Sequence, residues 1–143
     1  MIVYLDASAL VKRYVVESGS VEVGKLIGDA EALGTALVSR AEVSAALARA
    51  VRMKLIGHDA GIRALKAFTA DWPHLVRLQL PETLVARAAG LAWEHGLRGY
   101  DSVHLAAALL WHETLGAPVV VATFDRQLWS GARAAGLTAW PDA

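Results

Sequence analysis

The chain has 143 residues, of which 55% are hydrophobic and 20% charged, and its fourteen basic and fourteen acidic residues give a formal net charge of zero. This profile excludes a disordered chain and predicts one domain, residues 1–143, in which nucleic acid would have to be held by a local patch. Cysteine is absent, which excludes disulfides and thiolate metal sites, and no apolar run approaches the roughly 18 to 20 residues that span a bilayer, so we expect a cytoplasmic protein.

Short apolar runs alternate along the chain with stretches of helical periodicity. Strands are predicted at 2–5, 32–38, 75–80 and 119–122, with a possible short one at 137–140. Helices are predicted at 7–16, 21–29, 40–55, 59–71, 81–96, 102–114 and 124–135. Because apolar strands joined by helices are typical of parallel sheets covered on both faces, the pattern predicts an α/β fold, a three-layer α/β/α sandwich with a central parallel sheet.

Four acidic residues stand where this alternation could bring them together. Asp6 follows the first predicted strand and Asp125 closely follows the fourth, while Glu42 and Asp101 lie near the starts of two predicted helices. In open parallel sheets the functional crevice lies outside the carboxyl ends of the strands. If the first and fourth strands are neighbours, the two aspartates should therefore face each other across that crevice.

Each acid also has a purely local explanation. Ser39 and Glu42 have the spacing of a capping box, and the three aspartates occupy plausible N-cap positions, where a carboxylate is worth about 1 kcal/mol to its helix. For any single acid, capping is the simpler explanation. For all four together, convergence at one sheet edge favours a shared site, although crowded carboxylates repel one another unless a cation neutralises them.

The donor set indicates which cation would suit such a site. Hard oxygen ligands without cysteine favour Mg²⁺ or Mn²⁺, which retain water molecules and can activate one of them for attack on a phosphodiester. The residues predicted to bind the metal and to act in catalysis are Asp6, Glu42, Asp101 and Asp125.

Three further polar residues lie close to these acids in the sequence. Ser8 and Thr123 each stand two residues from an acid and are candidate supporting groups, although ordinary turn and cap bonding explains them equally well. His104 could reach the site from the helix of Asp101, but its apolar surroundings favour a hydrogen-bonded core histidine.

Tryptophan is unusually frequent for a chain of this length, with five residues. Trp93 and Trp111 fall in apolar helices and are predicted to lie in the core or a dimer interface. Trp129 follows Asp125 by one helical turn and could line a groove for a protein partner or for RNA bases.

Four stretches form a recognisable set, namely Val3–Lys12, Ser39–Val43, Gly99–Ala108 and Ala122–Asp125. Together they resemble the PIN-domain ribonucleases, most closely the VapC toxins of toxin-antitoxin modules, and the resemblance covers nearly the whole chain. It implies a PIN α/β/α sandwich and Mg²⁺- or Mn²⁺-dependent endonucleolytic cleavage of RNA by the four acids, with Ser8 and Thr123 in support. It also implies a homodimer and an antitoxin protein that inserts a segment near the active site.

RNA binding by a neutral chain depends on local basic residues. For each candidate, an ordinary solvated surface position is an equal alternative. The candidates are Lys12, Arg13, Arg40, Arg98 and Arg126.

Two alternative functions remain open. An Mg²⁺-dependent phosphatase or phosphotransfer domain also places aspartates at strand ends, but it needs a second acid beside the first and a lysine after a later strand. Here Ser8 stands in place of the second acid, and no lysine follows Asp125. A catalytically silent PIN-like scaffold that binds a protein partner is the non-enzymatic alternative.

Overall fold

The structure, a computed structural model that describes residues 1–142, is built on a five-stranded sheet in which every pair of neighbouring strands is parallel. The strands are β1 (Ile2–Leu5), β2 (Ala32–Ala36), β3 (Val76–Leu78), β4 (Val119–Ala122) and β5 (Thr138–Trp140). Their order across the sheet is β3-β2-β1-β4-β5. The predicted parallel sheet is therefore confirmed, and the possible last strand is present as β5, the outer strand beside β4.

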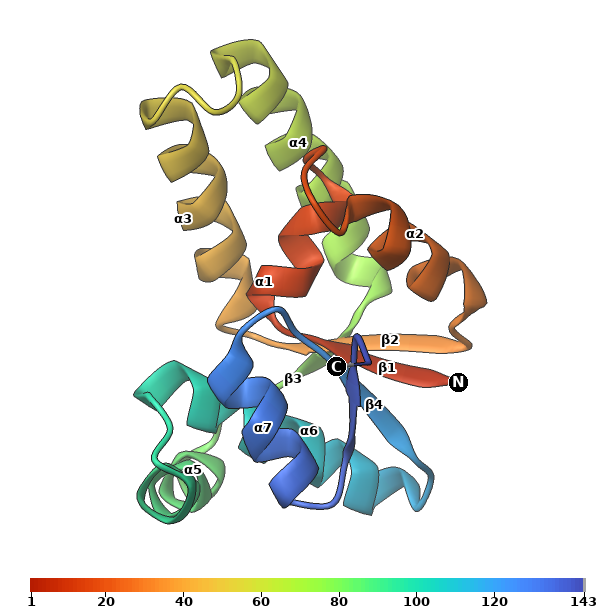
Figure 1. Ribbon diagram of the computed structural model, residues 1–143, viewed down its shortest axis with the longest axis vertical. Coiled ribbons are helices and arrows are strands. Elements are labelled where there is room, and N and C mark those ends of the chain that lie inside the picture. Colours follow the sequence, from red (N-terminus) through yellow and green to blue (C-terminus); the bar gives the residue numbers. More distant parts are fainter. Residues whose placement is uncertain (143) are drawn as a thin grey trace.

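Helices cover both faces of the sheet and complete the three-layer sandwich (Figure 1). One face carries α1 (Ala7–Leu10), α2 (Ser20–Asp29), α3 (Ser39–Arg52) and α4 (His58–Asp71), with the short 3₁₀ helices η1 (Val11–Arg13) and η2 (Trp72–His74). The other face carries α5 (Glu82–His95), α6 (Gly99–Leu115) and α7 (Arg126–Ala134). None of the described helices is long and apolar enough to cross a bilayer.

Each face of the sheet closes a separate hydrophobic cluster. Alternate side chains of β1 point to opposite faces, as the pleat requires, so Val3 and Leu5 pack beneath α1 and α3 whereas Tyr4 packs toward α6. Helix α6 approaches the sheet so closely that a Cβ atom at Gly34 would lie 2.6 Å from the Trp111 ring. Trp111 is thus a core residue, as predicted.

Two predicted helices differ clearly from the observed ones. The predicted helix 7–16 is α-helical only as far as Leu10 and then tightens into η1, in a stretch rich in β-branched valine, which propagates a helix poorly. The predicted helix 102–114 starts earlier, at Gly99, because Arg98 is already extended and serves as its N-cap. Trp93, predicted to lie in the core or a dimer interface, is 92% exposed on α5, which excludes the core and leaves the interface as a prediction.

Candidate active site

The two strands that precede Asp6 and Asp125 are neighbours. Strand β1 pairs with β4 in register, with Leu5 opposite Ala122, so the residues that follow both strands emerge at the same edge of the sheet. A cavity of about 770 Å³ opens at this edge. Its lining includes all four predicted acids together with Arg98 and His104.

Asp6 is the most deeply buried of the four acids, with only 4% of its surface exposed. Its Oδ1 accepts hydrogen bonds from the Ser8 hydroxyl at 2.7 Å and from the backbone N–H of Ala9 at 3.0 Å, and its Oδ2 accepts one from the Thr123 hydroxyl at 2.6 Å. Burial raises the pKa of Asp6, although His104 and these hydrogen bonds oppose the shift. The protein therefore holds a carboxylate whose negative charge is unfavourable unless a cation lies nearby.

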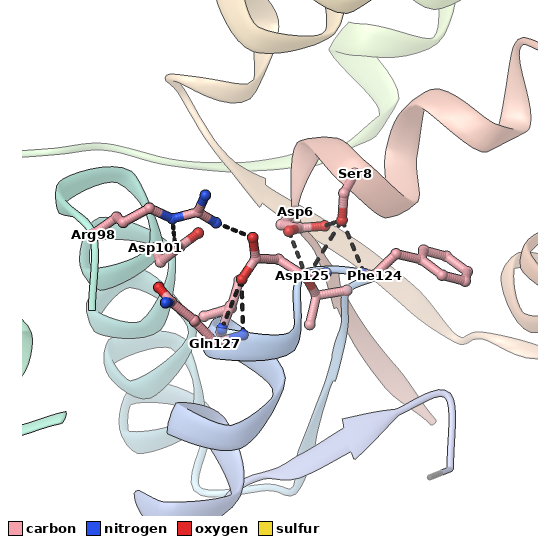
Figure 2. A network of polar contacts seen from close by, with 9 residues as sticks. Asp6, Ser8, Arg98, Asp101, Phe124, Asp125 and Gln127 are labelled. Carbon is pink, nitrogen blue, oxygen red and sulfur yellow. Dashed lines mark hydrogen bonds and ion pairs between the residues drawn. The ribbon is translucent and has the colours of Figure 1, made fainter. Parts of the chain in front are cut away.

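Ser8 and Thr123 join the loops after β1 and β4 into one network. Figure 2 shows Ser8 between Asp6 and Phe124. Besides donating to Asp6, Ser8 Oγ accepts from the Phe124 N–H at 2.9 Å, and Thr123 Oγ1 accepts from the Asp125 N–H at 3.0 Å. Each hydroxyl thus uses both its donor and its acceptor to fix the acids relative to each other.

One guanidinium bridges two of the acids, as Figure 2 shows. Arg98 Nε donates to Asp101 Oδ2 at 2.9 Å, and its Nη2 donates to Asp125 Oδ2. Asp101 lies within the first turn of α6, so its predicted N-cap position is wrong. A positive charge is thus accommodated between Asp101 and Asp125.

Asp6 and Asp125 cap helices as predicted, whereas Glu42 and Asp101 do not. Asp6 caps α1 through Ala9, and Asp125 Oδ1 caps α7 by accepting from the N–H groups of Gln127 at 2.9 Å and Leu128 at 3.1 Å. Capping and membership of a shared cavity are therefore compatible for these residues.

The predicted capping box of α3 is not formed. The N-cap of α3 is Val38, and Ser39 is instead buried, where its hydroxyl accepts from Thr35 at 2.6 Å. Glu42 is free to turn into the cavity, where its Oε1 lies 2.7 Å from His104 Nε2. His104 is 2% exposed, so the predicted buried, hydrogen-bonded histidine is confirmed, and it also contacts the site.

Paired variants at Asp125 separate its cap from its charge. Asp125→Asn keeps an oxygen that can cap α7 and should leave the free energy of unfolding nearly unchanged, whereas Asp125→Ala should lower it by about 1 kcal/mol. Chemical denaturation of the metal-free protein measures this difference. If the acid matters for chemistry, both variants should lose activity, whereas an active Asp125→Asn protein would assign Asp125 to capping alone.

The remaining basic candidates lie outside the acid cavity. Arg126 lines a neighbouring pocket of about 300 Å³ together with Trp129, whose indole N–H donates to the Pro141 carbonyl at 2.7 Å. Lys12 and Arg13 form ion pairs with Glu17 and Asp71. Arg40 lies over the ring of Trp72, 5.9 Å from its centroid.

The four acids have the donor chemistry for a divalent ion but not its geometry as they stand. Within residues 1–142, no three His, Asp or Glu side chains are placed to hold a metal ion as they stand. Arg98 and His104 instead bind oxygens of Asp101, Asp125 and Glu42. The chemistry of the donors nevertheless fits a hard cation, because four carboxylates line one cavity and a guanidinium already occupies the space between two of them.

The chain matches the PIN domain over residues 3–133 and belongs to the PIN-domain family. Over 145 aligned residues it is 39% identical to Ribonuclease VapC45 of Mycobacterium tuberculosis (strain CDC 1551 / Oshkosh), covering 98% of this chain and 95% of that protein.

Solved structures share the fold at lower identity. The M. tuberculosis toxin VapC20, which cleaves the sarcin-ricin loop, superposes with a TM-score of 0.68 at 16% identity, over 95% of this chain and 96% of that one. A toxin-antitoxin complex from Klebsiella pneumoniae gives a TM-score of 0.57 at 13% identity, over 82% of this chain and 83% of that one.

Proposed function

We propose that this protein is an Mg²⁺- or Mn²⁺-dependent endoribonuclease that acts as the toxin of a toxin-antitoxin pair. The observation that carries the proposal is the convergence of Asp6, Glu42, Asp101 and Asp125 on one cavity at the carboxyl edge of the sheet. The 39% sequence identity to Ribonuclease VapC45, over 98% of this chain, supports the proposed ribonuclease activity.

In this proposal the four acids hold the divalent ion and the supporting hydroxyls keep them in place. When bound, such an ion supplies a Lewis acid that activates water and offsets the charge that develops on the phosphodiester. Ser8 and Thr123 orient both oxygens of Asp6, which leaves little freedom for that carboxylate to turn away from the cavity.

The phosphatase alternative is less well supported. A phosphatase of this type needs a second acid close to the first, and Ser8 stands in that place here. The Ser8 hydroxyl donates to Asp6, so it supports that carboxylate and adds no second negative charge. The silent scaffold would have no need for a buried carboxylate whose charge is unfavourable. We therefore favour the nuclease over both alternatives.

The proposed partners are RNA, a cognate antitoxin protein and a second copy of the chain, with action in the cytoplasm. The fold shared with a toxin of a toxin-antitoxin complex is consistent with an antitoxin. The exposed indole of Trp93 is suited to burial in a protein interface.

A cleavage assay on purified protein tests the proposed function. Structured cellular RNA should be cut at internal positions with Mg²⁺ or Mn²⁺ and left intact with EDTA, and activity should return when excess Mn²⁺ is added. Cleavage that continues unchanged in EDTA would exclude metal dependence. Absence of cleavage for every RNA tested, with metal bound, would favour the scaffold.

Removal of Arg98 should strengthen metal binding, because its guanidinium competes for the oxygens of Asp101 and Asp125. In calorimetric titrations we expect Arg98→Gln to bind Mn²⁺ about three- to tenfold more tightly, a modest gain because Arg98 is solvent-exposed. Arg126→Gln, which also removes one arginine near the site, is the matched control. Weaker binding by Arg98→Gln would show that the arginine supports the ion.

A further inference from the structure

A hydrogen-bonded chain connects the hydrophobic core to the acid cavity. The Tyr4 hydroxyl lies 2.6 Å from His104 Nδ1, and His104 Nε2 lies 2.7 Å from Glu42 Oε1. Tyr4 is fully buried on β1, and His104 is 2% exposed on α6. The chain thus begins at a buried phenol and ends at one of the four acids.

One neutral tautomer of His104 satisfies both contacts. If the Tyr4 hydroxyl donates to Nδ1, the ring proton must lie on Nε2, which then donates to the Glu42 carboxylate. The phenol O–H can serve as the donor of the 2.6 Å contact with Nδ1. In this arrangement, Tyr4 determines that Nε2 is the nitrogen that donates, and it holds that N–H toward Glu42.

Glu42 depends on this contact for its orientation. Helices α3 and α6 lie on opposite faces of the sheet (Figure 1). Glu42 extends from α3 and His104 from α6, so their contact joins the two helical layers at the edge where the cavity opens. Glutamate has more rotatable bonds than aspartate and loses more conformational freedom when it is held in one position. The backbone at the start of α3 does not hold it, because the predicted capping box is not formed.

We propose that His104, held by Tyr4, is a positioning residue that fixes the Glu42 carboxylate in the cavity for the divalent ion. This inference rests on the proposed function and assigns His104 no contact with RNA. It predicts that loss of the Nε2–H donor weakens metal binding and slows turnover, while affinity for RNA changes little.

Three variants test the role of the donor. His104→Leu removes it, and His104→Gln keeps an N–H near the position of Nε2 and should rescue function. The double variant Tyr4→Phe/His104→Leu removes both buried polar partners and so avoids an unpaired phenol in the core. Thermal unfolding of the metal-free proteins establishes that each variant is folded.

The expected result is a 10- to 100-fold weaker Kd for Mn²⁺ in His104→Leu and in the double variant, by calorimetry, since loss of a group that orients a metal ligand has effects of this size. In RNA cleavage kcat should fall with KM nearly constant, and His104→Gln should recover most of both quantities. Folded His104→Leu protein with parental Mn²⁺ affinity and kcat would overturn the positioning role while leaving the nuclease proposal intact. If the parent itself neither binds Mn²⁺ nor cleaves RNA, the proposed function fails, and the positioning role fails with it.

Discussion

An Asp6→Asn protein should cleave RNA about a thousandfold more slowly than the parent, which corresponds to about 4 kcal/mol of lost transition-state stabilisation. The substitution removes the charge of the most buried acid and preserves its shape. Initial rates on a single RNA, at a Mn²⁺ concentration that saturates the parent, measure the effect. Asp59→Asn, which neutralises a highly exposed aspartate on α4, is the matched control and should retain full activity.

The same variant should be at least as stable as the parent without metal. The asparagine oxygen can still accept from Ser8 and Ala9, and its amide can donate to the Thr123 hydroxyl. Because the folded-state pKa of Asp6 is raised, the ionised carboxylate lowers stability at neutral pH.

The gain from asparagine should therefore be present at neutral pH. It should disappear as the pH falls below about 4, the ordinary aspartate pKa, where Asp6 is protonated in both the folded and unfolded chains. Denaturation curves in EDTA at several pH values provide the test. A large loss of stability in Asp6→Asn at neutral pH would be the contrary result, because asparagine keeps the cap bond from Ala9 and the loss would show that the ionised carboxylate stabilises the metal-free fold.

Thr123→Val should have the second largest effect, because one buried hydroxyl serves two site residues. Valine removes the donor to Asp6 and the acceptor for the Asp125 N–H, and Thr123 is only 1% exposed, so water cannot replace either partner. We expect about a 10- to 100-fold slower cleavage and a free energy of unfolding lower by about 1 to 3 kcal/mol.

Thr123→Ser is the matched control for this variant. Serine keeps the hydroxyl and loses only a methyl group, so its cleavage rate should stay within a few-fold of the parent. Cleavage by Thr123→Val at the parental rate would show that the hydroxyl does not orient Asp6 for the reaction.

The parts of the site that could be predicted from sequence follow from a general property of parallel sheets. Strands β1 and β4 are continuous apolar runs, and the residues that follow such strands gather at one edge whichever strands are neighbours. Asp6 and Asp125 were therefore predictable as residues of one sheet edge, and they face each other because β1 and β4 are neighbours. Their hydroxyl partners were predictable as well, because Ser8 and Thr123 lie two residues away on the same loops.

The contacts of Glu42, His104 and Arg98 could not be predicted in the same way. Glu42 and His104 are 62 residues apart and belong to opposite layers, and the strong local signal of a capping box suggested another role for Glu42. Arg98 was a candidate for RNA binding, whereas its guanidinium contacts two acids, one of them 27 residues away. Such pairings depend on side-chain geometry across elements, which periodicity does not report.

The hydrophobic pattern of the sequence predicted where helices lie better than where they begin or which of their residues are exposed. Helix α6 is apolar on nearly all sides, so its buried length was recognisable but its first turn, around Gly99, was not. Trp93 shows the converse case, because an apolar residue in an amphipathic helix can face solvent when its own face has no neighbour in the chain.

These acids should bind a divalent cation, and calorimetric titration of the metal-free protein with Mn²⁺ measures that binding without RNA or turnover. The parent and Asp59→Asn should bind Mn²⁺ saturably, and Asp6→Asn should lose that binding. Equal binding by the parent and Asp6→Asn, or no binding by the parent, would contradict the proposed metal site.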